Sequence, residues 1–590
     1  MSVISTRSTS VASILKTPGL RKKIASQSNR VRFRLPDDLK SVLINYESGR
    51  ETKPYEDLIY IVRDAPMKDS ELIQLLTQVR QCISLLGPKQ RIFIETLLKI
   101  NWINRDLEAT TAYKAFLEDL VCVHIYHCKL IIDRLVCLFR TISDENKEKW
   151  KDGKPPDEDI SKLFHVHDVL FKFLKIVPMS YSILLQCLSS QFPYFKHNMQ
   201  SHVVYVHSAL KILDYAPELR LDILSLIINK LVVIDVNAPR SEIENHRNNL
   251  DDDDEVFKIE SVNDKSSEQS REHPLALTLD MCMEKIFQFI HDTCYPNNAL
   301  NMENVKKIYL ELLQIFEKTI LPTYASHHVQ FIMFYICSVK TAVAEAFLNW
   351  LWHKVSNPNV PSIIRQSAVA YIASLLARAN FIPIDLLTSL LQKMGKWIHS
   401  YIAAQDSLES ANSDIRVHAV FYAVCQAVFY IIGFKHRDLV STKKNLLFLQ
   451  SLNFTKIISC QLNPLRVCLP VVVQHFATVT RTYQIAYCYT VIEHNSRSNL
   501  PVLQNSSRVT TPRLDTFFPF DPYILNESSH RISPLYLHYQ GSMNVETSTG
   551  NNKEENDEDD FMDISYPQEQ DSNNRKERFS YSTSPGFIHS

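Results

Sequence analysis

Four residues that could bind a metal lie close together between positions 122 and 128. Cys122, His124, His127 and Cys128 have the thiol and imidazole groups that hold zinc. His124 and Cys128 are one helical turn apart and could share a ligand face. A structural zinc site normally draws its ligands from two separated pairs, however, and no second Cys-x-x-Cys accompanies this cluster. We therefore interpret these residues as ordinary core and surface positions, and predict no metal and no other cofactor.

The motifs of catalysis and nucleotide binding are missing from the sequence. We find no GxGxxG, GxxxxGK[ST], HExxH or GxSxG. Glycine is also scarce, with 9 residues in 590, whereas the usual share is about 7%. Phosphate-binding loops and β-rich folds need glycine at their tight turns. The sequence therefore predicts a non-enzymatic protein made of helices.

Two histidines and an arginine stand out in the dense helical part of the chain. His327 and His328 are interpreted as core residues, because histidines and aromatics at helical spacing are more often packed than exposed for binding. Arg378 falls near the end of a predicted helix. We expect it to stabilise that helix end through the helix dipole; contact with a partner is the alternative.

Charge is unevenly distributed, although the formal net charge is only −1. Basic residues gather in 1–36, and acidic runs occur at 251–255 and 554–560. One-signed segments that lack periodic apolar residues are usually disordered. We predict a disordered basic tail over 1–36, an acidic disordered loop over 241–272 and an acidic, Ser-rich disordered tail over 541–590.

Short regulatory motifs fall in the two predicted tails. Thr17-Pro18 and Ser584-Pro585 could be reached by a proline-directed kinase, and phosphorylation there would add about −1.5 to −2 charge. Residues 30–33 read Arg-Val-Arg-Phe, which fits the phosphatase-docking pattern RVxF. A basic tail produces such a match easily, so phosphatase docking stays open.

The cysteines are typical of an intracellular protein. Most of them, such as Cys187, Cys337 and Cys425, lie within apolar helical stretches, which favours reduced, buried thiols over a disulfide framework. The N-terminus has no apolar signal-peptide core, and no uninterrupted run of about 20 apolar residues indicates a membrane span.

A chain of 590 residues is too long for one compact core. Apolar periodicity predicts N-terminal helical repeats over 37–240 and C-terminal helical repeats over 273–495. The clearest unit, 361–401, reads as two helices broken at Asn380 and Pro383, like one unit of a HEAT array. Residues 496–540, rich in proline and aromatics, are predicted to pack on the repeats as an extended strap, with Phe517, Phe518 and Phe520 as its structural anchors. Irregular helical bundles are the alternative architecture.

Several long segments resemble one family closely. They are SHHVQFIMFYICSVKTAVAEAFLNWLW (326–352), IIRQSAVAYIASLLARANFIP (363–383), FYAVCQAVFYIIGFKHRDL (421–439), LQSLNFTKIISCQLNPLRVCLPVVVQHF (449–476), LDTFFPFDPYIL (514–525) and INKLVVIDVNAPR (228–240). On these segments, which occur in the family's order, the chain resembles the TIF-IA family of RNA polymerase I-specific initiation factors over about 40–540.

The resemblance implies an all-α HEAT-repeat superhelix in the nucleus and nucleolus. It implies binding to the stalk and neighbouring surface of RNA polymerase I, bridging to a promoter-bound selectivity or core factor, control by regulatory kinases, and self-association as a homodimer. Direct DNA contact is left open. A HEAT-type nuclear transport or scaffold protein is the alternative function.

The resemblance also implies a patch of serines as the polymerase-binding surface. The candidates in the matching region are Ser180, Ser182, Ser189, Ser190 and Ser201, and Ser201 is also a phosphorylation candidate beside Thr17 and Ser584. Ordinary helix caps and turns, which serine favours, are the alternative for each of them.

Overall fold

The computed structural model describes residues 36, 38–64, 67–140, 157–243, 273–324, 326–406, 415–498, 514 and 518–539, with side chains from 160 onward in the fourth range. The predicted tails and almost all of the predicted acidic loop lie outside these residues. The start of that loop was placed wrongly, because residues 241–243 are helical and Ile243 is buried.

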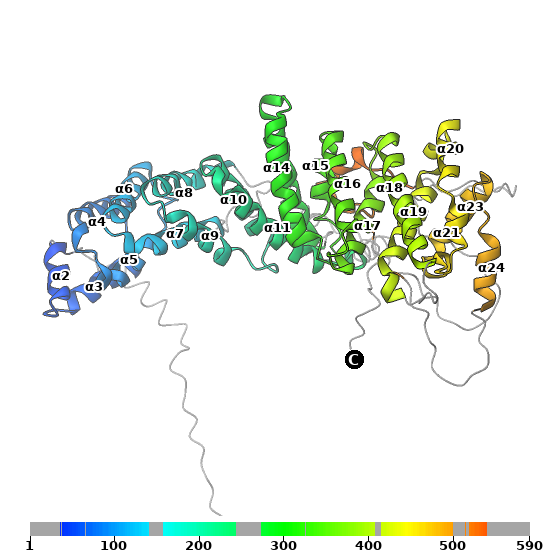
Figure 1. The fold of residues 1–590 in the computed structure, drawn as a ribbon. Coiled ribbons are helices and arrows are strands. Elements are labelled where there is room, and N and C mark those ends of the chain that lie inside the picture. Colours follow the sequence, from blue (N-terminus) through cyan, green and yellow to red (C-terminus); the bar gives the residue numbers. More distant parts are fainter. Residues whose placement is uncertain are drawn as a thin grey trace, which may run out of the picture. The chain divides into compact units, whose positions relative to one another are not determined.

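The described ranges are helical, which confirms the all-α repeat class (Figure 1). The chain divides into two compact units, one formed by residues 1–149 and 155–191 and the other by 150–154 and 192–590. The division at 191 therefore falls inside the segment that the sequence assigned to a single N-terminal repeat block.

The first unit is a series of short helices. They are α2 (Leu39–Glu47), α3 (Lys53–Asp64), α4 (Asp69–Gln81), η1 (Ile83–Leu85), η2 (Pro88–Gln90), α5 (Arg91–Leu98), α6 (Leu107–Val123), η3 (Ile125–His127), α7 (Cys128–Cys137), η4 (Leu138–Arg140), α8 (Asp157–Ile176) and α9 (Ser180–Gln191).

The helices of the first unit form two layers. Helix α6 packs between α4 and α8 in one layer, and the other contains α3, α5, α7 and α9 in the same order (Figure 1). Periodic apolar residues hold the layers together: Leu72, Leu75, Leu76 and Val79 of α4 are all fully buried. Alternation of successive helices between two layers is the arrangement of a helical-repeat protein.

The second unit contains longer helices. They are α10 (Met199–Lys211), η6 (Ile212–Asp214), η7 (Pro217–Leu219), α11 (Arg220–Val236), α13 (Pro274–Cys294), η9 (Pro296–Asn298), α14 (Met302–Ile315), the π-helix η10 (Phe316–Ile320), α15 (Phe331–Ser338), α16 (Thr341–Ser356), α17 (Ser362–Arg378), α18 (Ile384–Asp406), α19 (Ile415–Val440), α20 (Lys443–Ser451), α21 (Phe454–Ile458), α22 (Pro464–Val467), α23 (Pro470–Thr482), α24 (Tyr489–Ser498), α25 (Ser529–Ile532) and η11 (Ser533–Leu535).

Helices α17 and α19 form the centre of the second unit. Helix α17 packs against α16 and α19, and α19 packs against α18 and α23. The predicted pair within 361–401 is confirmed, because α17 ends at Arg378 and α18 begins at Ile384. Helix α19 is long and apolar enough to cross a membrane, yet 78% of its most apolar stretch is buried inside the protein, as expected of a core helix.

Residues 518–539, called the strap below, are the main described part of the predicted aromatic segment. The strap is extended except for the short α25 and η11, because Pro519 and Pro522 cannot sit in a helix interior. Tyr536 forms an isolated antiparallel bridge with Ala379 just after α17. The strap therefore lies against helices of the second unit that are far from it in sequence.

Candidate interaction sites

Helix α9 presents an uncharged face to solvent. Residues 178–195 contain no Asp, Glu, Lys, Arg or His. Met179, Ser182, Gln186, Ser189 and Ser190 are exposed at helical spacing, whereas the opposite face packs against α7. A solvent-facing helix surface without charge is unusual, because such surfaces are normally rich in charged residues. The face formed by these five residues is called the α9 face below.

The serine hydroxyls of the α9 face bond within their own helix. Ser182 Oγ donates to the carbonyl oxygen of Met179 at 3.0 Å, and Ser190 Oγ donates to that of Cys187 at 3.1 Å. Each hydroxyl oxygen keeps lone pairs that a partner's donors could reach. The face can therefore accept hydrogen bonds without exposing charge.

Two of the predicted serines do not belong to the α9 face. Ser180 is fully buried, and its Oγ donates to the carbonyl oxygen of Val177 at 2.5 Å, so it cannot contact a partner while α9 is folded. Ser201 lies in the second compact unit, in the first turn of α10, where its backbone N–H donates to the Asn198 side chain at 3.2 Å. Thr17 and Ser584 lie outside the described residues, as do residues 30–33.

The cysteine and histidine cluster of the first unit has backbone partners. His124 Nε2 lies 2.7 Å from the carbonyl oxygen of Ile83, and His127 Nε2 lies 3.0 Å from that of Leu86. These contacts hold the two histidines against the turns before α5, whereas Cys122 is exposed. Among the described residues, no group of three or more His, Cys, Asp or Glu is placed to hold a metal ion.

Two phenylalanines anchor the first residues of the strap. Phe520 is fully buried among Phe331, Phe334 and Tyr371, with ring centroids 5.1–5.7 Å away. Phe518 stacks on Tyr430 of α19 at 4.6 Å. Aromatic contacts at these distances add to the free energy of burying the rings. Phe517, expected from the sequence to be a further anchor, lies outside the described residues.

Polar contacts fix the backbone of the same residues. The Phe520 N–H donates to Ser374 Oγ at 2.9 Å, and Gln330 Nε2 donates to the carbonyl oxygen of Pro519 at 2.7 Å. Both partners are buried. Because a buried backbone group without a partner is costly, these side chains make it favourable for the strap to enter the core.

Arg378 is the last residue of α17, in the position that the interpretation through the helix dipole requires. Its guanidinium is buried against two aromatic rings, 4.9 Å from the centroid of Phe434 and 5.4 Å from that of Tyr536. The strap also supplies a donor to the end of α17: the Leu537 N–H donates to the Arg378 carbonyl oxygen at 2.7 Å. The strap thus caps the C-terminal end of α17.

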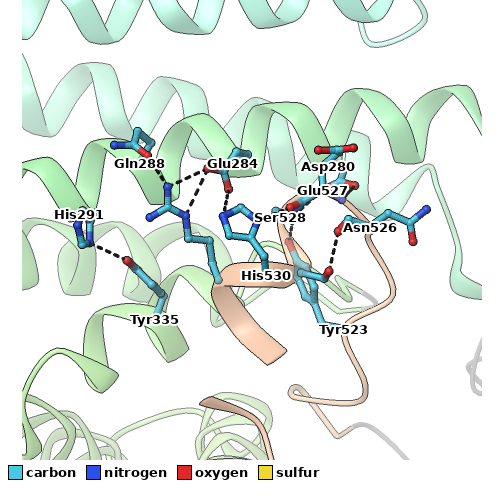
Figure 2. A network of polar contacts seen from close by, with 12 residues as sticks. Asp280, Glu284, Gln288, His291, Tyr335, Tyr523, Asn526, Glu527, Ser528 and His530 are labelled. Carbon is cyan, nitrogen blue, oxygen red and sulfur yellow. Dashed lines mark hydrogen bonds and ion pairs between the residues drawn. The ribbon is translucent and has the colours of Figure 1, made fainter. Parts of the chain in front are cut away.

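A buried carboxylate on α13 holds the middle of the strap (Figure 2). Asp280 accepts hydrogen bonds from the backbone N–H groups of Glu527 at 2.7 Å and Ser528 at 2.8 Å, and from Ser528 Oγ at 2.5 Å. Tyr523 Oη lies 2.8 Å from the same Ser528 Oγ. These donors offset the cost of burying the Asp280 charge.

One turn further along α13, the network continues at its edge. Arg531 pairs with Glu284 at 2.9 Å and also contacts Gln288. Beyond them, Tyr335 of α15 meets His291 Nδ1 at 3.3 Å. The side chains of Arg531 and Glu284 keep only 17% and 21% of their surface exposed, so solvent screens this pair less than a surface ion pair.

A second buried carboxylate organises the residues before α15. Asp235 accepts from the backbone N–H groups of His327, His328 and Val329 at 2.9–3.0 Å. Its other oxygen pairs with His328 Nδ1 at 2.8 Å. Burial alone would raise the pKa of Asp235, but the attraction to His328 and these hydrogen bonds outweigh it and lower the pKa below the usual value of 3.8.

His328 also contacts the strap. It is buried, as expected from the sequence, and its ring meets Tyr523 edge to face at 5.5 Å. Sequence reasoning missed both carboxylates. The available signal was a lone acidic residue inside an apolar run, LVVID for Asp235 and LALTLD for Asp280, since such a charge must find partners when its helix is buried.

The fold defines a helical-repeat protein, with two-layered helices and an uncharged face in the first unit and a strap that packs on the helices of the second. Residues 37–544 match the family described as RNA polymerase I specific transcription initiation factor RRN3. The chain belongs to this family.

Two relatives and one solved structure show the extent of the similarity. The chain is 36% identical to RNA polymerase I-specific transcription initiation factor RRN3 of Mus musculus, over 89% of this chain and 85% of that protein. It is 26% identical to the corresponding factor of Schizosaccharomyces pombe, over 81% of each chain. The crystal structure of RNA polymerase I transcription initiation factor Rrn3 superposes with a TM-score of 0.67 at 22% identity, covering 87% of this chain and 98% of that one, which supports the fold.

Proposed function

We propose that this protein binds RNA polymerase I and joins it to promoter-bound core factors, so that transcription of ribosomal RNA genes can start. Membership of the initiation-factor family is the main support. The protein would then act in the nucleus, and within it in the nucleolus. The proposal favours an initiation factor over the alternative of a HEAT-type transport or scaffold protein.

The α9 face is the polymerase contact in this proposal, with Ser182, Ser189 and Ser190 as its hydrogen-bonding residues. Ser180 is left out because it is buried. An uncharged surface is inexpensive to desolvate, whereas a phosphate on it would have to be stripped of water or paired. A loss of about 2.7 kcal/mol would already weaken binding about a hundredfold. Kinases acting on these serines would thus switch the contact off.

The second unit is assigned the promoter-side contact. The strap contacts α13 through Asp280 and α17 through Ser374 and Arg378. Its Phe520 packs on α15 and its Phe518 on α19. A rigid surface of this kind is what a bridging protein needs. Self-association as a homodimer is part of the proposal, and direct DNA contact is left open by it.

Co-purification from nuclear extract tests the proposed function. The full chain should retain RNA polymerase I subunits together with promoter-bound core factors, and phosphatase treatment should increase the amount retained. Recovery of nuclear transport partners without polymerase subunits would contradict the proposal and support the transport protein instead.

A further inference from the structure

A Ser-Pro pair lies in the strap, apart from those in the tails. Ser533 and Pro534 begin η11, and both are exposed. The residues on either side are held in place: Ile532 and Tyr536 are buried, and Arg531 pairs with Glu284. The pair is therefore an exposed point in an otherwise packed segment.

The backbone of Ser533 has a conformation that its neighbour opposes. Its φ is −52° and its ψ is −41°, in the α-helical region. The ring of a following proline clashes with helical backbone and favours extended backbone at the residue before it. Residues 531–537, once released from the helices, would relax toward the extended form in which kinases bind their peptide substrates.

The contacts around Ser533 are sensitive to negative charge. The carbonyl oxygens of Pro534 and Leu535 accept from Asn380 Nδ2 at 2.7 Å and Asn380 N at 3.1 Å, just after α17 ends. The C-terminal end of a helix has a partial negative charge that repels anions. A phosphate on Ser533 would also compete with Glu284 for the Arg531 guanidinium.

We propose that Ser533 is a phosphorylation site for a proline-directed kinase, and that phosphorylation keeps residues 531–537 released from α13 and α17. In this reaction Ser533 Oγ forms a bond to the γ-phosphorus of a nucleoside triphosphate. The bond from that phosphorus to the β–γ bridging oxygen breaks, the nucleoside diphosphate leaves, and the hydroxyl proton goes to the kinase and then to solvent. This phosphorylation and the release of the strap do not rest on the proposed binding to RNA polymerase I.

The first test measures how fast the purified full chain is phosphorylated at Ser533 by a proline-directed kinase and ATP, with the site assigned by mass spectrometry. Because the kinase acts on the released form, Asn380→Ala and Arg531→Ala should raise the initial rate about fivefold, as a change of about one kcal/mol in the release equilibrium implies. Asn445→Ala is the matched control and should leave the rate unchanged, because this half-buried asparagine of α20 also donates from Nδ2 to a backbone carbonyl, that of Asp438, but does not contact the strap.

The second test follows amide exchange in peptides spanning Asn380 and Leu537, in the unmodified and phosphorylated chain. Exchange should become about fivefold faster after phosphorylation, with Ser533→Ala treated with kinase as the control. If no phosphate were found on Ser533 in the wild type, in Asn380→Ala or in Arg531→Ala, Ser533 would not be a phosphorylation site. Unchanged or slower exchange would contradict the proposed release of residues 531–537. Slower exchange is the result expected if the phosphate paired with Arg531 and held the strap in place.

Discussion

The carboxylate of Asp280 accepts a hydrogen bond from the backbone N–H of Ser528 across 248 residues of sequence, at 2.8 Å. This contact joins α13 to the strap and belongs to a set that includes the N–H of Glu527 and the hydroxyl of Ser528. A single buried side chain thus satisfies the donors of a segment that forms no regular ladder of its own.

Replacement of Asp280 should therefore destabilise the second unit. Asp280→Ala leaves the buried backbone N–H of Ser528 without an acceptor, at about 1–3 kcal/mol for a buried unsatisfied group, and also removes the acceptor of the part-buried Glu527 N–H. The thermal unfolding transition of the second unit should shift down by several degrees. Asp292→Ala, on the exposed side of the same helix, is the control, and an equal shift in both variants would contradict the role of Asp280.

Truncation of Phe520 should have a comparable effect through packing. Phe520→Ala removes a fully buried ring, and such a change costs about 3–5 kcal/mol. Urea unfolding followed by fluorescence measures the loss, with Tyr487→Ala, whose side chain is 58% exposed, as the control. If Phe520→Ala unfolded like the wild type, the strap would not be part of the core.

The pair of Asp235 and His328 predicts how stability depends on pH. The folded state lowers the pKa of Asp235 below 3.8, so its contribution is fully present above that value and is lost as pH falls through the lowered folded value. The free energy of unfolding should decline below about pH 4. Asp235→Asn cannot titrate at this position. The difference in the free energy of unfolding between the wild type and this variant should therefore become smaller as the pH falls. A difference that grows on acidification would contradict the lowered pKa of Asp235.

Local patterns predicted the helices and the buried aromatics better than the long-range polar contacts. The apolar spacing within 361–401 was enough to predict α17, α18 and the break between them, and the density of aromatics around Phe518 and Phe520 indicated packing. The partners of Asp280 and Asp235 could not be predicted, because they lie 248 and 93 residues away. The contacts of Arg378 with Tyr536 and Leu537 of the strap could not be predicted for the same reason, because these residues are distant in sequence.

The serines show a second limit of local pattern. Ser180 and Ser182 are both favoured at the start of a helix, but only packing shows that Ser180 faces the core and Ser182 faces solvent. The division into units at 191 was likewise invisible, because helices continue on both sides of it. The lack of charge over residues 178–195 becomes informative only with the structure, which places part of that stretch at the surface.

The affinity of purified RNA polymerase I for Ser→Asp and Ser→Ala variants of the α9 face tests the central claim most directly. Ser189→Asp and Ser190→Asp should each weaken the complex, by about a hundredfold if the charge is desolvated without a partner, while the Ala variants should bind like the wild type. Ser356→Asp is the control, because this serine also ends a helix and its Oγ also donates to a carbonyl three residues earlier. Wild-type or tighter binding by both Asp variants of α9 would contradict the account.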